Sequence, residues 1–235
     1  MHTHPFFQLS KTRQQRWQWG ILAAMLLLLI GIGLIGISTQ QYWVGLLLPL
    51  PIQLAAPFLD MPSGKKSGRL IYYAPLFVVE PTRKKTILLH GGTLFDYFFV
   101  LPHVHAVPLR RRRVLHDYVR GLRLLAKACM ERQEGDSRLR GTTYFLRPET
   151  VRTFGFEPVR TDAGQRLVLW LNAAQVTLAY SWLNQAFRWP PLTNIRTYEA
   201  KASAVWDQRE KLEKLEKQLA KSLNRTLPID PAHNT

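Results

Sequence analysis

The 43 residues from Trp17 to Leu59 contain no charged side chain, and this run constrains the fold more than any other feature of the chain. The surface of a soluble domain does not have this composition. Within the run, the stretch from Gly20 to Ile37 is almost wholly aliphatic. About twenty such residues in a helix span the roughly 30 Å hydrocarbon core of a bilayer. The sequence therefore predicts a transmembrane helix over about residues 19–38.

A second apolar segment covers residues 42–59 and is interrupted by three prolines. Two topologies are consistent with it. Either both segments form a transmembrane hairpin, or only the first spans and the second lies in the interface or enters the following domain. The turn between the segments has no charge, whereas cations lie outside both of them: Lys11, Arg13, Arg16, Lys65, Lys66 and Arg69. The positive-inside rule favours the hairpin, with both ends in the cytoplasm at an inner or plasma membrane.

The remaining sequence has the length and composition of one folded domain. Of the 235 residues, 46% are apolar and 20% charged, which leaves room for an anchor and a single domain. Strand-like and helix-like patterns alternate, so we expect the α+β class, a mixed soluble domain with a long charged C-terminal helix over about residues 197–223. The predicted organisation is a basic N-terminus (1–16), a transmembrane region (17–60), a linker (61–68), a basic globular domain (69–227) and a tail (228–235).

A third uncharged run extends from Leu167 to Phe187. It contains several amide and hydroxyl side chains, so its hydropathy is well below that of the first helix. Polar groups are costly in hydrocarbon unless they find partners. We therefore expect this run to form a buried central helix of the domain rather than a third membrane span.

The net charge is +16, with 32 Lys and Arg against 16 Asp and Glu, and this excess favours polyanionic neighbours. Apolar residues recur at helical spacing over about residues 108–133 and predict a basic amphipathic helix. The cations expected to bind an anionic surface are Arg110, Arg111, Arg112, Arg113, Arg120, Arg123 and Lys127. Because the chain is tethered to a membrane, lipid is the preferred partner. Nucleic acid is the alternative, and the C-terminal helix is a candidate site for a protein partner.

His90 and Asp96 flank Gly91-Gly92 at the end of a predicted strand. A histidine oriented by a carboxylate can act as a general base. Membrane-bound glycerolipid acyltransferases use such a pair separated by four residues. Five residues separate it here, so the motif does not assign the chain to that family. The sequence leaves open a non-catalytic membrane module, an enzyme acting on a lipid or acyl substrate through His90 and Asp96, and a plain turn after the strand.

The single cysteine, Cys129, excludes an internal disulfide and a Cys-rich zinc site. His103, His105, His116 and Asp117 are residue types that bind zinc, but they lack the spacing of an established zinc motif. We therefore expect neither a metal nor a cofactor.

Overall fold

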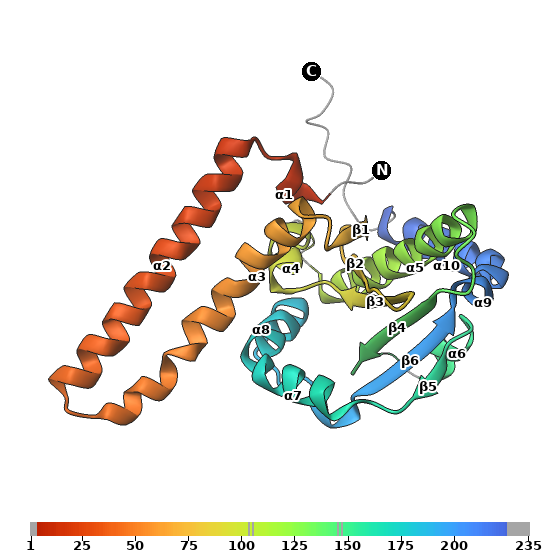
Figure 1. Ribbon diagram of the computed structural model, residues 1–235. Coiled ribbons are helices and arrows are strands. Elements are labelled where there is room, and N and C mark those ends of the chain that lie inside the picture. The colour runs from red at the N-terminus through yellow and green to blue at the C-terminus, as the bar shows by residue number, and fades with distance from the viewer. Residues whose placement is uncertain (1–3, 103, 105, 145, 147, 225–235) are drawn as a thin grey trace, which may run out of the picture.

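The computed structural model describes residues 4–224, apart from residues 103, 105, 145 and 147. A pair of long helices projects from an α+β domain built on a six-stranded mixed sheet (Figure 1). The predicted α+β class and the helical hairpin at the N-terminus are both present in the structure.

The hairpin consists of α2 (Lys11–Ser38) and α3 (Pro49–Lys66), joined by the 3-10 helix η1 (Tyr42–Leu47). A short helix, α1 (Pro5–Gln8), precedes it. The Ser10 hydroxyl caps α2 by accepting a hydrogen bond from the Arg13 backbone, which satisfies one of the free amides of the first turn. Both segments of the hairpin are long and apolar enough to cross a membrane, which suggests membrane association.

Helix α3 continues through most of the segment 61–68, which the sequence analysis assigned to a linker. Pro57 and Pro62 lie inside this helix, where each removes one backbone hydrogen bond. The last turns nevertheless stay helical because they pack against the domain. A side chain on Gly64 would come within 2.6 Å of the Leu70 side chain, which would have to move to make room.

The sheet has the strand order β1-β2-β3-β4-β6-β5. Its strands are β1 (Ile71–Ala74), β2 (Phe77–Pro81), β3 (Thr86–Gly91), β4 (Arg138–Thr143), β5 (Glu157–Val159) and β6 (Arg196–Lys201). Only β3 and β4 run parallel among the described strands, because α4 (Leu94–Val100) and α5 (Val107–Glu131) return the chain between them. Strands β1 and β2 form a hairpin around Pro75, and the chain after Gly92 continues as helix α4.

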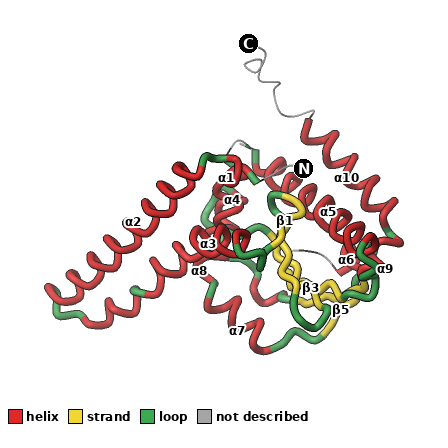
Figure 2. The backbone as a smooth tube through the Cα atoms, turned by 45° about the horizontal axis from the view of Figure 1, so that its top comes forward, coloured by secondary structure: helices red, strands yellow, loops and turns green. Residues whose placement is uncertain are grey.

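Helices cover both faces of the sheet (Figure 2). On β2, Phe77 and Val79 join the core formed with α5, whereas Val78 points to the opposite face. There it packs with α1, α3 and α4, so the base of the hairpin is part of the core of the domain. Helix α5 was predicted closely, and its apolar stripe faces the sheet as the spacing indicated.

The prediction of a buried central helix over 167–187 is wrong. The chain forms two shorter helices, α7 (Ala163–Leu171) and α8 (Ala173–Asn184), and α7 has no buried residue. A break at Asn172, whose side chain donates to the Val168 carbonyl, separates them. Helix α8 lies beside α3 and α4, and α7 packs next to α8 at the lower left of the sheet in Figure 1.

The C-terminal helix begins later than the sequence indicated. Residues 196–201 form β6, in which Thr197 and Tyr198 are buried, and the helices that follow are α9 (Ala202–Asp207) and α10 (Arg209–Asn224). Helix α6 (Pro148–Arg152) is short, and Gly155 after it has a φ of +83°, a conformation that glycine adopts without strain after a helix. The 3-10 helix η2 (Leu192–Asn194) leads into β6.

Candidate functional site

The first two arginines of the predicted anion-binding face hold α8 in place. Arg110 is 7% exposed, and its guanidinium donates to the Val104 carbonyl at 2.6 Å and to the Trp182 carbonyl. Arg111 donates to the side-chain oxygen of Asn184. The last carbonyls of a helix lack partners within it and carry partial negative charge, so guanidinium groups stabilise them. These two arginines therefore fasten the end of α8 to the start of α5.

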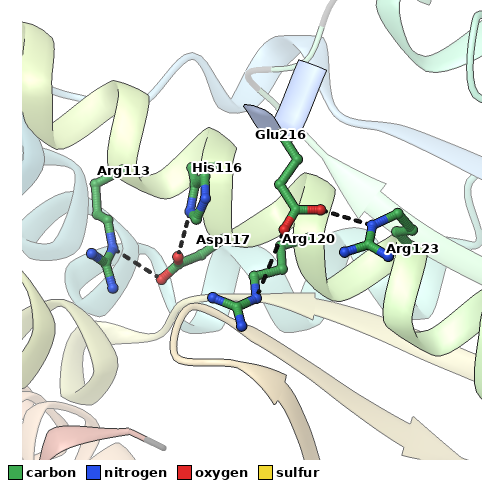
Figure 3. Close-up of polar contacts among 6 residues, drawn as sticks. All are labelled: Arg113, His116, Asp117, Arg120, Arg123 and Glu216. Carbon is green, nitrogen blue, oxygen red and sulfur yellow. Dashed lines mark hydrogen bonds and ion pairs between the residues drawn. The ribbon is translucent and has the colours of Figure 1, made fainter. Parts of the chain in front are cut away.

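Arg113 and His116 share one buried carboxylate, that of Asp117 (Figure 3). The Arg113 Nε lies 3.3 Å from one oxygen of Asp117, and the His116 Nδ1 lies 3.0 Å from the other. Asp117 is 1% exposed, and a carboxylate buried to this extent needs such partners to replace its lost hydration. The carboxylate orients the imidazole of His116 through Nδ1. Proton transfer at the other ring nitrogen, Nε2, would require an imidazole oriented in this way.

Arg120 and Arg123, the next two cations of the predicted face, connect α5 to α10. Glu216 of α10 lies 2.8 Å from Arg123 Nε and 3.9 Å from Arg120 Nε, and Figure 3 shows the carboxylate between the two guanidinium groups. The hydrogen bond to Glu216 raises the pKa of Arg123. Lys127 pairs with Glu131 one turn later. Arg112 is exposed and forms no hydrogen bond or ion pair with the described residues.

Asp96 is completely buried and forms a capping box at the start of α4. One carboxylate oxygen accepts from the Thr93 backbone at 2.7 Å and from the Thr93 hydroxyl at 2.8 Å. The other accepts from the Tyr72 hydroxyl at 2.9 Å and lies 3.3 Å from His4 Nε2. Burial and the neighbouring carboxylate raise the pKa of Tyr72 far above its ordinary range.

His90 has a different environment from Asp96. Its Nε2 lies 3.4 Å from Glu80, and its side chain is 42% exposed. Burial lowers the pKa of His90, an effect that Glu80 partly opposes. The structure gives the two predicted catalytic residues separate partners and forms no hydrogen bond or ion pair between them within the described chain. At the turn between them, a side chain on Gly92 would come within 2.8 Å of the Tyr97 ring.

A cluster at the base of the hairpin was not anticipated from the sequence. His4 is 2% exposed and stacks on Phe95 with ring centroids 5.1 Å apart. Phe6 lies 5.0 Å from the same ring, and the Lys65 ammonium lies 3.5 Å from the centre of Phe7. The aromatic pair at positions 6–7, unusual in a basic N-terminal segment, was the available signal. The cluster fixes the direction in which the hairpin leaves the domain.

Cys129 is buried in the core, and burial raises the pKa of its thiol. Within the part of the chain that the structure describes, no group of three or more His, Cys, Asp and Glu side chains could hold a metal ion. His103 and His105 lie outside the described residues.

Comparison with known proteins found no matching family model, no matching curated protein and no matching solved structure.

Proposed function

We propose that this protein is a non-catalytic membrane-anchored module whose hairpin crosses the bilayer and holds a basic domain against the cytoplasmic leaflet. The observation that carries the proposal is the surface of α2. Apart from Gly36, no residue of its apolar stretch is buried inside the protein, and Leu27, Leu34 and Ile37 are 69%, 62% and 71% exposed. A stripe of this length and hydropathy is stable in hydrocarbon and unstable in water.

The charges at the two ends of the hairpin support a cytoplasmic domain. Lys11, Arg13 and Arg16 are exposed at the start of α2, and Lys66 is exposed at the end of α3. The turn at the opposite end has no charged side chain. Retention of positive charge on the cytoplasmic side would place the base of the hairpin, and the domain with it, inside.

The base of the hairpin offers cations to anionic headgroups more directly than α5 does. Arg110, Arg113, Arg120 and Arg123 already have partners within the domain, which lowers their value to a lipid. The cations at the start of α2 lie next to the apolar stretch and are exposed. Each juxtamembrane cation contributes about 1 kcal/mol near an anionic surface, and the effect falls off within a Debye length. Arg112 is the member of the α5 face best placed to add to this.

Two alternatives, a protein partner bound by α10 and an enzymatic activity, have less support. The apolar side of α10 packs on α5, with Leu212 completely buried, so only its charged outer side is open to a protein partner. An enzyme acting through His90 and Asp96 gains no support from the contacts, because the carboxylate is committed to the capping box and to Tyr72.

Thermal unfolding of the purified full chain in detergent tests the lipid preference. A ligand that binds only the folded state raises the melting temperature. We expect added anionic lipid to raise it more than zwitterionic lipid, and high salt to remove the difference. Replacing Lys11, Arg13 and Arg16 by Gln should abolish the effect. The matched control replaces three exposed lysines of α10, which are Lys214, Lys217 and Lys221, and should retain it. Equal stabilisation by both lipids would contradict the proposal.

A further inference from the structure

Helix α7 presents an apolar surface that nothing in the described chain covers. Leu167, Val168, Trp170 and Leu171 are 60%, 56%, 74% and 58% exposed. Their spacing places them together on the side of the helix away from the domain. The same exposure continues after α8, where Phe187 and Trp189 are 69% and 71% exposed with their rings 5.7 Å apart. An apolar patch of this kind on a folded domain marks an interaction surface.

The orientation of α7 and α8 is fixed by polar contacts on their inner sides. The side-chain oxygen of Gln165 lies 3.3 Å from the Thr142 hydroxyl and 3.2 Å from the Thr197 hydroxyl, which join α7 to β4 and β6. Arg110 and Arg111 hold the other end of the pair through the last turn of α8. The apolar side therefore faces outward because the domain places it there.

The α8 side of this pair borders the base of the hairpin. An apolar groove runs from the start of α2 across α4 to α8, and its lining includes Leu9, Trp17, Phe98 and Trp182. Ring centroids are 5.7 Å apart between Trp17 and Phe98, and 5.9 Å apart between Phe98 and Trp182. Aromatic residues of this kind are enriched where membrane proteins meet the headgroup region.

The charge pattern around the pair is that of a segment lying in a membrane interface. No charged residue occurs from Leu167 to Phe187, and the first charges on either side are Arg166 and Arg188. Both of these arginines are exposed. Arginine stems cover apolar surface while their charged ends reach headgroups, so flanking arginines suit a shallow position in an anionic leaflet.

We propose that α7, α8 and the aromatic segment after them form a second membrane contact, which inserts shallowly into the leaflet beside the hairpin. The bilayer in which the hairpin is anchored then covers the exposed apolar surface. This inference rests on the proposed membrane anchoring, because the hairpin supplies the position of the bilayer. The second contact would hold the domain on the membrane in one orientation, whereas the hairpin alone would leave the domain free to reorient.

Spin labels in the full chain, reconstituted into vesicles of mixed zwitterionic and anionic lipid, test this placement. In a Cys129→Ala background, single cysteines replace Val168 or Leu171, whose side chains are already exposed and so tolerate a label. Relaxation by oxygen reports hydrocarbon, and relaxation by a water-soluble nickel complex reports solvent. We expect oxygen to dominate at both α7 positions. Gln218→Cys on α10 is the matched helical control and should show the reverse.

A label at Leu27 in α2 separates the two levels of the proposal. If Leu27 is in hydrocarbon while positions 168 and 171 are as accessible to nickel as position 218, the anchoring stands and the second contact is refuted. If Leu27 itself is accessible to nickel, the anchoring fails. Spin–spin broadening at 168 and 171 that disappears on dilution with unlabelled protein, together with low access to oxygen, would show a second copy on this surface and would also overturn the inference.

Discussion

Removing the Asp96 carboxylate should destabilise the protein far more than removing the His90 imidazole. Asp96 is completely buried and accepts from Thr93 twice and from Tyr72, with His4 3.3 Å away. A hydrogen bond to a charged group contributes about 1.5–3 kcal/mol, and loss of an N-cap costs about 1 kcal/mol. Because these contributions overlap and the buried donors of Thr93 and Tyr72 would lose their acceptor, we expect Asp96→Ala to cost about 3–5 kcal/mol.

Thermal unfolding of the full chain in detergent measures this effect. For a protein of this size, 1 kcal/mol corresponds to a shift of about 2–4 °C, so Asp96→Ala should lower the melting temperature by roughly 10 °C. Asp96→Asn keeps one acceptor oxygen but places an amide against donors, so it should fall between wild type and Asp96→Ala. The His90→Ala control should change little, since its side chain is 42% exposed and its contact with Glu80 is screened by solvent.

The reasoning would be refuted if Asp96→Ala melted within about 1 °C of wild type, a shift that corresponds to well under 1 kcal/mol. It would also fail if the His90 variant were the less stable of the two. A pair of catalytic residues would instead show two stable variants that share one lost activity.

Three further predictions concern the core of the domain and its titratable groups. Gly121→Ala should destabilise by about 1–3 kcal/mol despite the better helix propensity of alanine, because the added carbon would lie 2.4 Å from the Phe77 ring; Phe77→Leu in the same chain should recover part of the loss in chemical denaturation. Cys129 should resist a thiol reagent in the folded protein and react fully after denaturation, since it is 2% exposed and burial raises its pKa; rapid reaction in the native state would contradict its place in the core. The lowered pKa of His90 means that the folded state favours the neutral imidazole, so its contribution to stability is present above pH about 6.5 and is lost as the pH falls below that value. Plots of melting temperature against pH for wild type and His90→Gln should therefore converge or cross below pH about 6.5. Parallel plots would refute this assignment.

The parts of the fold that could be predicted from the sequence are those where one local signal dominates. The uncharged run from Trp17 to Leu59 indicated the hairpin, and the apolar spacing of residues 108–133 indicated α5. In each case a pattern within one segment determines its structure without help from distant residues.

The errors have a common cause, which is packing between segments far apart in the chain. Residues 61–66 contain proline and glycine and resemble a linker, but they stay helical because they pack against the domain at Leu70. The run from Leu167 to Phe187 resembles a core helix by composition, and only the structure shows that the domain leaves its apolar side uncovered. Composition gives the preference of a segment for an apolar environment, but it does not say whether protein or lipid provides that environment.

The candidate site residues were limited in the same way. Arg110, Arg120 and Arg123 lie on one side of α5 in the sequence pattern, but their partners come from α8 and α10 and cannot be read from local spacing. Asp96 was predicted as the carboxylate partner of His90, and the capping spacing from Thr93 was the signal for its observed contacts. His4 could not have been paired with Asp96 from the sequence, because 91 residues lie between them.

The most direct test of the account is the side of the membrane on which each end of the hairpin lies. In a Cys129→Ala background, single cysteines at Gln41 in the turn and at Lys211 on α10 are exposed to a maleimide that cannot cross membranes. We expect Gln41→Cys to be labelled in intact cells, whereas Lys211→Cys should be labelled only after the cells are lysed. Labelling of Lys211→Cys in intact cells, or protection of Gln41→Cys until lysis, would contradict a hairpin that crosses the membrane and keeps the domain in the cytoplasm.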